Sequence, residues 1–368
     1  MASDARLREW KGAVGAAALL IAVLGTGLLA AGGLEEGEGL RLPAPEAAEA
    51  AAPSTTTTRP PPRPVTLVFA GDIHFEDSLA VRLRRDPATA LAPARELLAG
   101  ADAVVANLET AVTARGTRAE KQFAFRAPAS AFVALREAGI TVVSMANTHG
   151  LDYGPDGIAD AMAAADAAGV ELIGIGRDRA AALAPSVLDL DGARVAVFGA
   201  TDVLDDDLAA EWTAGVDRPG MASAKDPRPL LAAIEAVRPT VDTVVVHLHW
   251  GVEAESCPSD RQRALAQRVV AAGADVVVGS HAHRLQGAGR HGDAFVAYGL
   301  GNFAFRAVSV LGAQSGALEV QVTGRRIESY RWRPATIDDS LPRPLRGAAA
   351  DGAVRNWDRL RGCTDLAA

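Results

Sequence analysis

Cysteine is scarce in this sequence, positive charge does not dominate, and no segment repeats. The chain has only two cysteines, Cys257 and Cys363, which excludes a cysteine-rich zinc module. Its 36 glycines and 20 prolines follow no fixed period, which excludes a collagen-like chain. The formal net charge of −8 offers no positive field to gather phosphates, so a general nucleic-acid-binding role is excluded. A local cationic centre such as bound metal remains compatible with this composition.

The chain does have enough apolar sequence for a large folded unit. It contains 368 residues, of which 49% are hydrophobic and 22% are charged, as expected for one large or two ordinary domains with a buried core. Histidine shows an uneven distribution. Six of the seven histidines fall in short clusters at His74, His149, His247 with His249, and His281 with His283. Scattered surface histidines would not group in this way.

The N-terminal region contains an uncharged apolar run at residues 12–33. In a helix at about 1.5 Å per residue, this run spans roughly 30 Å, the thickness of a bilayer core. Basic residues from Arg6 onward precede it and acidic residues from Glu35 onward follow it. The positive-inside rule therefore predicts a single-pass anchor, with residues 1–11 cytoplasmic and the rest of the chain outside the cell membrane. The alternative is a cleaved signal peptide, which Ala30 would permit and which would leave a secreted protein.

Composition divides the remainder of the chain into three parts. Residues 34–64 are rich in Pro, Thr and Ala, which predicts an extended linker that lifts the next domain off the membrane. Residues 65–337 carry the regular patterns of a folded domain. Residues 338–368 have weak periodicity and are expected to form a tail that wraps the domain surface or is partly mobile.

Apolar strand-like runs alternate with helical patterns through most of the domain. Strands are predicted at 65–70, 102–107, 141–145, 194–200, 243–248 and 275–279, and helices at 88–99, 128–138, 155–168 and 259–272. Further strand-like runs without helices follow at 294–298, 317–322 and 326–332. The first pattern predicts an α/β fold with a sheet covered by helices, and the late strands predict a second, more antiparallel sheet.

Polar clusters follow the predicted strands at their carboxyl ends. Open α/β sheets place their ligand sites at this edge, so these clusters are expected to converge. In chain order they are Gly71-Asp72-Ile73-His74, Asn107-Leu108-Glu109, Asn147-Thr148-His149 with Asp152-Tyr153-Gly154, His247-Leu248-His249-Trp250-Gly251, Gly279-Ser280-His281-Ala282-His283 and Gly299-Leu300-Gly301-Asn302-Phe303. Each cluster alone is weak evidence, because a single Asp after a strand is often a helix cap and a single His is often a hydrogen-bonded structural residue.

Together, the clusters predict a site for two divalent cations. Carboxylate, amide and imidazole ligands without thiolate suit Mn, Fe, Zn or Co. Two such cations about 3.5–4 Å apart need a carboxylate between them, with His and Asp on either side. A nearby histidine that does not bind metal would then transfer protons.

The ordered motifs resemble the CapA family of poly-γ-glutamate capsule-synthesis proteins, a branch of the calcineurin-like metallophosphoesterase superfamily. The resemblance spans about residues 65–306 and implies a sandwich of two β-sheets flanked by helices. It implies that a two-metal site is formed by Asp72, His74, Glu109, Asn147, His249, His281 and His283. Glu109 takes the place of the bridging acid, and His281 and His283 each bind one of the two metals.

The resemblance also implies that His149 is the catalytic acid. Two departures from the superfamily pattern affect this site. Thr148 separates Asn147 from His149, which are adjacent in the superfamily, and Glu109 replaces an Asp.

Several other residues have both a functional and a structural interpretation. Asp152 orients His149 or forms a turn with Gly154, and Asn302 reaches the site or shapes a turn. Glu253 orients His249 or contacts substrate, or it is a solvated loop carboxylate. His247 shares a strand face with His249 and ranks below it. Arg284 suits an anionic substrate or is an ordinary surface arginine.

Cys257 and Cys363 could form a disulfide that pins the tail to the domain, since the expected compartment is oxidising.

For function, the family resemblance favours a metal-dependent hydrolase outside the membrane. Its substrate would be a phosphoester or an isopeptide bond in a polyglutamate-like polymer. Expected partners are the membrane, an anionic polymer and a membrane polyglutamate synthase complex. The alternatives are a non-catalytic, polymer-binding assembly factor and a general secreted metallophosphatase.

Overall fold

The computed structural model describes residues 62–368. The predicted membrane span at 12–33 lies outside the described residues, as does most of the predicted linker at 34–64. Within residues 62–368, every helix is too short or too polar to cross a bilayer.

The first of two main sheets has eight strands in the order β18-β17-β16-β1-β2-β5-β6, with β15 also paired to β1. Its parallel part consists of β1 (Val65–Ile73), β2 (Ala103–Leu108), β5 (Val142–Ser144), β6 (Glu171–Ile173) and β15 (Asn302–Ala304). Its antiparallel part consists of β16 (Gln314–Thr323), β17 (Arg326–Asp338) and β18 (Leu341–Pro344). The prediction that the late strands form a separate antiparallel sheet is therefore wrong, because β16 pairs directly with β1.

The second main sheet has six strands in the order β13-β14-β12-β11-β9-β8. Its parallel centre consists of β9 (Ala193–Thr201), β11 (Thr243–His249), β12 (Val276–Ser280) and β14 (Ala294–Ala297). Antiparallel edge strands are β8 (Ser186–Leu190) and β13 (Ala288–His291). Two further two-stranded pairs are β3 (Ala111–Val112) with β4 (Arg126–Ala127) and β7 (Ile175–Gly176) with β10 (Gly220–Met221).

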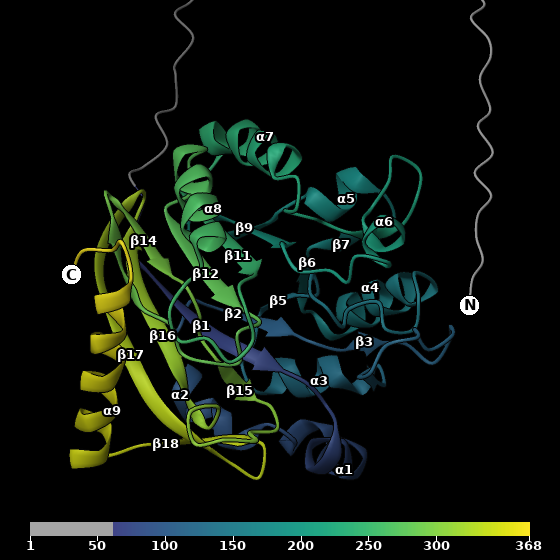
Figure 1. Ribbon diagram of the computed structural model, residues 1–368, viewed down its shortest axis with the longest axis horizontal. Coiled ribbons are helices and arrows are strands. Elements are labelled where there is room, and N and C mark those ends of the chain that lie inside the picture. The colour runs from purple at the N-terminus through teal and green to yellow at the C-terminus, as the bar shows by residue number, and fades with distance from the viewer. Residues whose placement is uncertain (1–61) are drawn as a thin grey trace, which may run out of the picture. The chain divides into compact units, whose positions relative to one another are not determined.

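The two main sheets pack face to face, and helices cover their outer faces (Figure 1). Alternate residues of the two sheets form one apolar cluster, in which Phe69 and Val105 share a core with Val245 and Val278. The first sheet's outer face packs against α1 (Asp77–Arg85), α3 (Ser130–Glu137) and α4 (Asp156–Ala168), and the second sheet's against α5 (Arg179–Leu183), α7 (Arg228–Val237) and α8 (Asp260–Ala271). The predicted two-sheet α/β sandwich flanked by helices is confirmed.

Local sequence explains why one predicted helix forms and another does not. Helix α8 begins at a capping box in which Ser259 and Gln262 bond reciprocally, as its predicted start implies. The helix predicted at 88–99 is wrong. Two short 3₁₀ turns (Pro87–Thr89 and Ala92–Ala94) and the single turn α2 (Arg95–Leu98) occupy it instead. Pro93 lies inside this segment and has no N–H to donate to a continuous helix.

Four contacts tie the C-terminal tail to the domain. Strand β18 extends the first sheet, and α9 (Gly347–Leu360) places Trp357 against Trp332 of β17 with ring centroids 5.3 Å apart. Beyond α9, Ala367 exchanges backbone hydrogen bonds with Arg290. Cys363 forms a disulfide with Cys257, with the Cα atoms 5.7 Å apart, so the pairing considered from sequence is present.

We expect the double variant Cys257→Ser/Cys363→Ser to be destabilised by about 2–4 kcal/mol, because the disulfide closes a long loop in the unfolded chain. Urea unfolding of the oxidised protein and the variant measures this difference. The oxidised protein treated with reductant serves as the matched control and should unfold like the variant. Equal unfolding midpoints for all three samples would show that the noncovalent contacts of α9 hold the tail without the bond.

Candidate functional site

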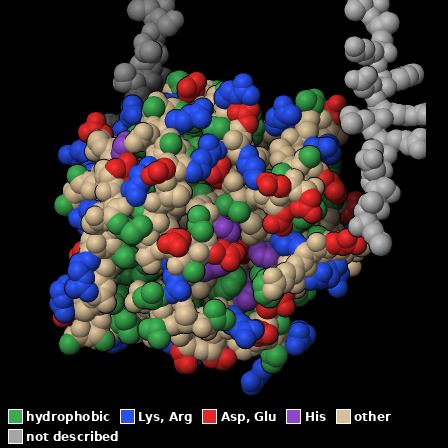
Figure 2. Space-filling view, in the orientation of Figure 1, with side chains coloured by type: hydrophobic (Ala, Val, Ile, Leu, Met, Phe, Trp, Pro, Cys, Tyr) green, Lys and Arg blue, Asp and Glu red, His purple; other side chains and the backbone are tan. Residues whose placement is uncertain are grey.

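The polar clusters predicted from sequence meet at one edge of the sandwich. The carboxyl ends of β1, β2 and β5 in the first sheet lie beside those of β11 and β12 in the second (Figure 1), and histidine side chains gather in a hollow at the centre of the face shown in Figure 2. Two glycines allow the close approach. A Cβ at Gly71 would lie 1.9 Å from the carbonyl oxygen of Gly301, and one at Gly279 would lie 2.1 Å from that of Tyr298.

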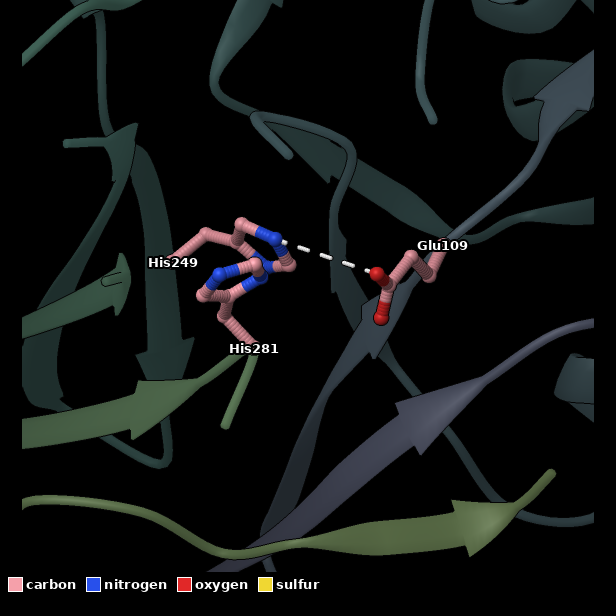
Figure 3. Close-up of side chains that lie close together, drawn as sticks. All are labelled: Glu109, His249 and His281. Carbon is pink, nitrogen blue, oxygen red and sulfur yellow. Dashed lines mark ion pairs between the residues drawn. The ribbon is translucent and has the colours of Figure 1, made fainter. Parts of the chain in front are cut away.

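Glu109, His249 and His281 form one buried group of ligand-type atoms, all within 4.8 Å of one another. Figure 3 shows the two imidazoles facing the carboxylate of Glu109, with His249 Nε2 and Glu109 Oε1 3.8 Å apart. The second group consists of Asp72, Glu109 and His283. There, His283 Nδ1 lies 3.1 Å from Asp72 Oδ2, and His283 Nε2 lies 3.8 Å from Glu109 Oε1.

The carboxylate of Glu109 belongs to both groups, which is the arrangement expected of a bridging ligand between two cations. His281 and His283 fall into different groups. Both histidines have positive φ angles, 91° and 51°, a conformation that costs a non-glycine residue about 1–3 kcal/mol. Backbone strain of this kind is common at ligand-binding sites, where it holds a side chain in the orientation that binding requires.

Burial and neighbouring charges shift the pKa of each of these buried groups. Burial, together with the charge of Asp72, raises the pKa of Glu109 to about 8. Burial, together with neighbouring imidazoles, lowers the pKa of His281 to about 4 and that of His249 well below its usual range. For His283, burial disfavours the charged ring, but the carboxylates of Glu109 and Asp72 outweigh it and raise the pKa to about 10.

The buried His281 Nδ1 has no hydrogen-bond partner within residues 62–368, and the imidazole of His283 is the one charged neighbour of Asp72 Oδ2 there. Leaving buried polar atoms unsatisfied is costly, and divalent cations are bound by such oxygen and nitrogen atoms. The residues present therefore fit one or two metal ions.

Asn107 connects the acidic residues of the site, a role that the sequence interpretation missed. Its Nδ2 donates to Asp72 Oδ1 at 2.9 Å and to Glu109 Oε2 at 3.2 Å, and lies 3.4 Å from His249 Nδ1. The sequence does contain a signal for this role. Side chains alternate between the two faces of a strand, and Asn107, two residues before Glu109, therefore lies on the same face as Glu109.

Asn147 and Thr148 lie on the side of the site formed by β5. Asn147 Nδ2 donates to Asn107 Oδ1 and to the carbonyl of Leu108, and its Oδ1 accepts the N–H of His149. The predicted ligand Asn147 therefore joins β5 to β2. Thr148, which interrupts the superfamily pattern, places its hydroxyl 3.4 Å from Glu109 Oε1 and 3.3 Å from His249 Nε2.

His74, also predicted as a ligand, belongs to neither metal-type group. Its Nε2 accepts the N–H of Arg306 at 3.0 Å, and its ring stacks on Phe305 with centroids 3.8 Å apart. Burial and the neighbouring His283 and His149 lower its pKa to about 3. In this arrangement the ring holds the 305–306 segment against the site, while its buried Nδ1 has no hydrogen-bond partner.

His149 is held by a buried carboxylate, as predicted for Asp152. Its Nδ1 lies 2.6 Å from Asp152 Oδ2, which also accepts the N–H of Phe125. The ammonium of Lys121, missed from sequence, lies 3.1 Å from Asp152 Oδ1 and donates to the carbonyl of Thr148. Burial lowers the pKa of His149, although Asp152 partly offsets this effect. The neutral ring donates from Nδ1 and leaves Nε2 able to accept a proton.

The remaining predicted residues surround this centre. Asn302 Oδ1 lies 2.8 Å from His283 Nδ1, so Asn302 does reach the site. Ser280 Oγ lies 3.1 Å from His249 Nδ1. His247 is buried and neither ring nitrogen has a hydrogen-bond partner within residues 62–368. Glu253 is exposed, and it lines the cleft described next.

A cleft of about 720 Å³ lies over the site, and His74, His149 and His283 form part of its lining. Phe123, Phe125 and Phe305 line it as well, and it is wide enough for a small ligand or a segment of polymer.

Comparison with known proteins finds relatives named for capsule and polyglutamine synthesis. The chain is 32% identical over 235 residues to "Capsule biosynthesis protein CapA" of Bacillus anthracis, covering 63% of this chain and 56% of that one. It is 29% identical over 248 residues to "PGA biosynthesis protein CapA" of Bacillus subtilis, covering 67% and 64% respectively. It is also 30% identical over 189 residues to "Probable polyglutamine synthesis accessory protein Rv0574c" of Mycobacterium tuberculosis, covering half of each chain.

The chain therefore spans about half to two thirds of the length of the curated relatives that it matches. The family described as "Bacterial capsule synthesis protein PGA_cap" matches residues 66–307, which include all the strand-end clusters. This protein belongs to the PGA_cap family of bacterial capsule synthesis proteins.

Proposed function

We propose that this protein is a metal-dependent hydrolase that acts in the synthesis or export of a poly-γ-glutamate-like capsule or cell-envelope polymer. The observation that carries the proposal is the carboxylate of Glu109, shared by two groups of metal-ligating side chains beneath an open cleft. The bond cleaved would be a phosphoester or an isopeptide bond. In the hydrolysis of either bond, negative charge develops in the transition state, and a bound cation would stabilise it.

The residues that would hold the metals are Asp72 and His283 on one side of Glu109, and His249 and His281 on the other. Their oxygen and imidazole donors suit Mn, Fe, Zn or Co. Bound cations of this kind lower the pKa of a coordinated water and neutralise charge on the reacting group. Asn107 would fix the carboxylates of Asp72 and Glu109 in their positions through its two N–H groups.

His149 would move the proton. Its Nδ1 bond to Asp152 fixes the ring and leaves Nε2 free to take a proton and then return it to a leaving group. The ammonium of Lys121 forms an ion pair with Asp152 and so holds this carboxylate where it can accept the imidazole N–H.

The polymer role rests on the names of the relatives, which refer to capsule, PGA and polyglutamine synthesis. We propose that the domain works outside the cell membrane, anchored by residues 12–33, beside a membrane polyglutamate synthase complex. The Cys257–Cys363 disulfide supports an oxidising compartment, because such bonds rarely persist in the cytosol.

We expect the full-length protein to bind about two divalent ions per chain. Glu109→Gln keeps the size of the side chain but removes the shared charge, so its metal content should fall below one ion per chain. Elemental analysis after dialysis gives the count. The matched control is Glu255→Gln, an exposed carboxylate near the cleft that should retain both ions. The proposal would be contradicted if the wild-type protein bound no metal, or if the Glu109→Gln variant kept two ions.

For catalysis, His149→Gln should lower hydrolysis about 10²–10⁴-fold, and Asp152→Asn about 10–100-fold, with metal content unchanged. Turnover of a phosphodiester reporter and cleavage of oligo-γ-glutamate measure the two candidate reactions. If metal-loaded wild type cleaves neither substrate, the domain is better explained as a non-catalytic, polymer-binding assembly factor. Turnover of small phosphate esters at rates comparable to dedicated phosphatases would favour a general secreted metallophosphatase.

For location, residues 62–368 should be digested by protease added to intact spheroplasts expressing the full chain, because the proposed topology places them outside. A cytoplasmic protein in the same cells provides the control for lysis. Protection of the domain until detergent is added would contradict the topology.

A further inference from the structure

Three arginines line the cleft above the candidate metal site: Arg118, Arg284 and Arg306. Two of them already have partners. The Arg118 guanidinium donates to the backbone carbonyls of Ala119, Lys121 and Gln122. Arg306 forms an ion pair with Asp77, with Nη1 and Oδ2 3.6 Å apart. The positive charge of Arg306 is therefore partly compensated within the fold, and the Arg118 side chain is committed to shaping its own loop.

Arg284 differs from both. Its Nη1 is buried and has no hydrogen-bond partner, and its side chain forms no ion pair within residues 62–368. A guanidinium stays charged at any pH that a folded protein meets, so the fold holds a permanent positive charge there without a counter-charge. A half-buried charge of this kind is unfavourable unless an anion approaches it.

The backbone holds Arg284 in position. Leu285 pairs with Leu300 in an isolated β-bridge, and the carbonyl carbon of Arg284 lies 3.2 Å from where a Cβ on Gly301 would be. Arg284 also directly follows His283 and shares the cleft lining with His283 and His149. An anionic group that meets Arg284 would therefore lie beside the candidate metal site and the proton-transfer residue.

The acidic residues of the cleft do not already serve this purpose. Asp77 pairs with Arg306, and Glu76 accepts the backbone N–H of Arg126. Glu253 is exposed and forms no ion pair within the described part of the chain. None of these three carboxylates forms an ion pair with Arg284, so its guanidinium is available to an incoming anion.

We propose that Arg284 binds an anionic group of the substrate, a carboxylate or a phosphate, and so selects polyanionic substrates for this cleft. The inference rests on the proposed function for the identity of the neighbouring reaction, but the binding itself is a separate property. A guanidinium suits either anion, because its planar N–H groups match two oxygens at once. On a polyglutamate-like polymer the carboxylate would come from a side group next to the reacting bond. On a phosphoester it would be the phosphoryl group.

The test uses full-length, metal-loaded protein in detergent and two probes, oligo-γ-glutamate of five residues and inorganic phosphate. Arg284→Met keeps the length of the aliphatic stem but removes the charge, and Arg284→Lys keeps the charge but loses the paired N–H groups. Arg136→Ala, which removes an exposed arginine from α3, is the control for net charge. Calorimetric titration gives the affinities, and metal content reports whether each variant has kept the site.

We expect Arg284→Met to bind at least one probe about 10–100-fold more weakly, with Arg284→Lys intermediate and Arg136→Ala unchanged. Loss confined to the pentaglutamate assigns Arg284 to a carboxylate, and loss confined to phosphate assigns it to a phosphoryl group. If wild type binds metal but neither probe, or if Arg284→Met matches Arg136→Ala for both, the proposal is overturned. A wild type without metal refutes the metal hypothesis alone, since the titrations then still show whether anion binding depends on Arg284.

Discussion

The carboxylate of Glu109 is the point on which the rest of the site depends. It is almost fully buried, it lies near a second buried carboxylate at Asp72, and imidazoles face it from two sides. Burial disfavours its charged form and the charge of Asp72 disfavours it further, so the pKa of Glu109 is raised and burying this carboxylate costs stability. The two packed sheets end at the same edge, and this packing holds the buried side chains together despite the cost.

The packing of the two sheets explains why the ligands come from such distant parts of the chain. The first sheet supplies Asp72 and Glu109, and the second supplies His249 and His281. The shared apolar core sets the distance between these strand ends, so the spacing of the site is a property of the whole sandwich. Gly71 and Gly279 have no side chain for the same reason, because the loop at 298–301 passes against both of them.

Much of this arrangement could be predicted from the sequence, because parallel strands share one edge and each cluster follows a buried strand. The family resemblance, not spacing, identified Glu109 as the shared ligand. Alternation places Asn107 on the same strand face as Glu109, but its bonds to Asp72 and Asn147 could not be predicted, since these partners lie at other strands whose register is set by packing. The same limit applies to β16, because its apolar pattern fits either sheet and only its pairing with β1 decides between them.

Asn147 and His74, which the sequence places among the metal ligands, also form hydrogen bonds with backbone groups. Both residues lie at the predicted strand ends, but Asn147 Nδ2 meets the Leu108 carbonyl and His74 Nε2 meets the Arg306 N–H. A side chain that satisfies a buried backbone group contributes to the fold whether or not an ion is present. Sequence motifs identify which residues reach a site, whereas the local supply of donors and acceptors decides what each one does there.

The C-terminal tail supports one wall of the cleft. The segment from Glu253 to Cys257 lies beside the site and is held from two directions. Gln286 donates to the carbonyl of Glu255, and the disulfide joins Cys257 to the end of the tail. Gln286 in turn accepts from Gln262 of the α8 capping box, so a helix start, a hydrogen-bonded amide pair and a covalent bond all fix one loop. A loop that carries Glu253 and Ala254 into the cleft needs such support, because water otherwise competes for its backbone groups.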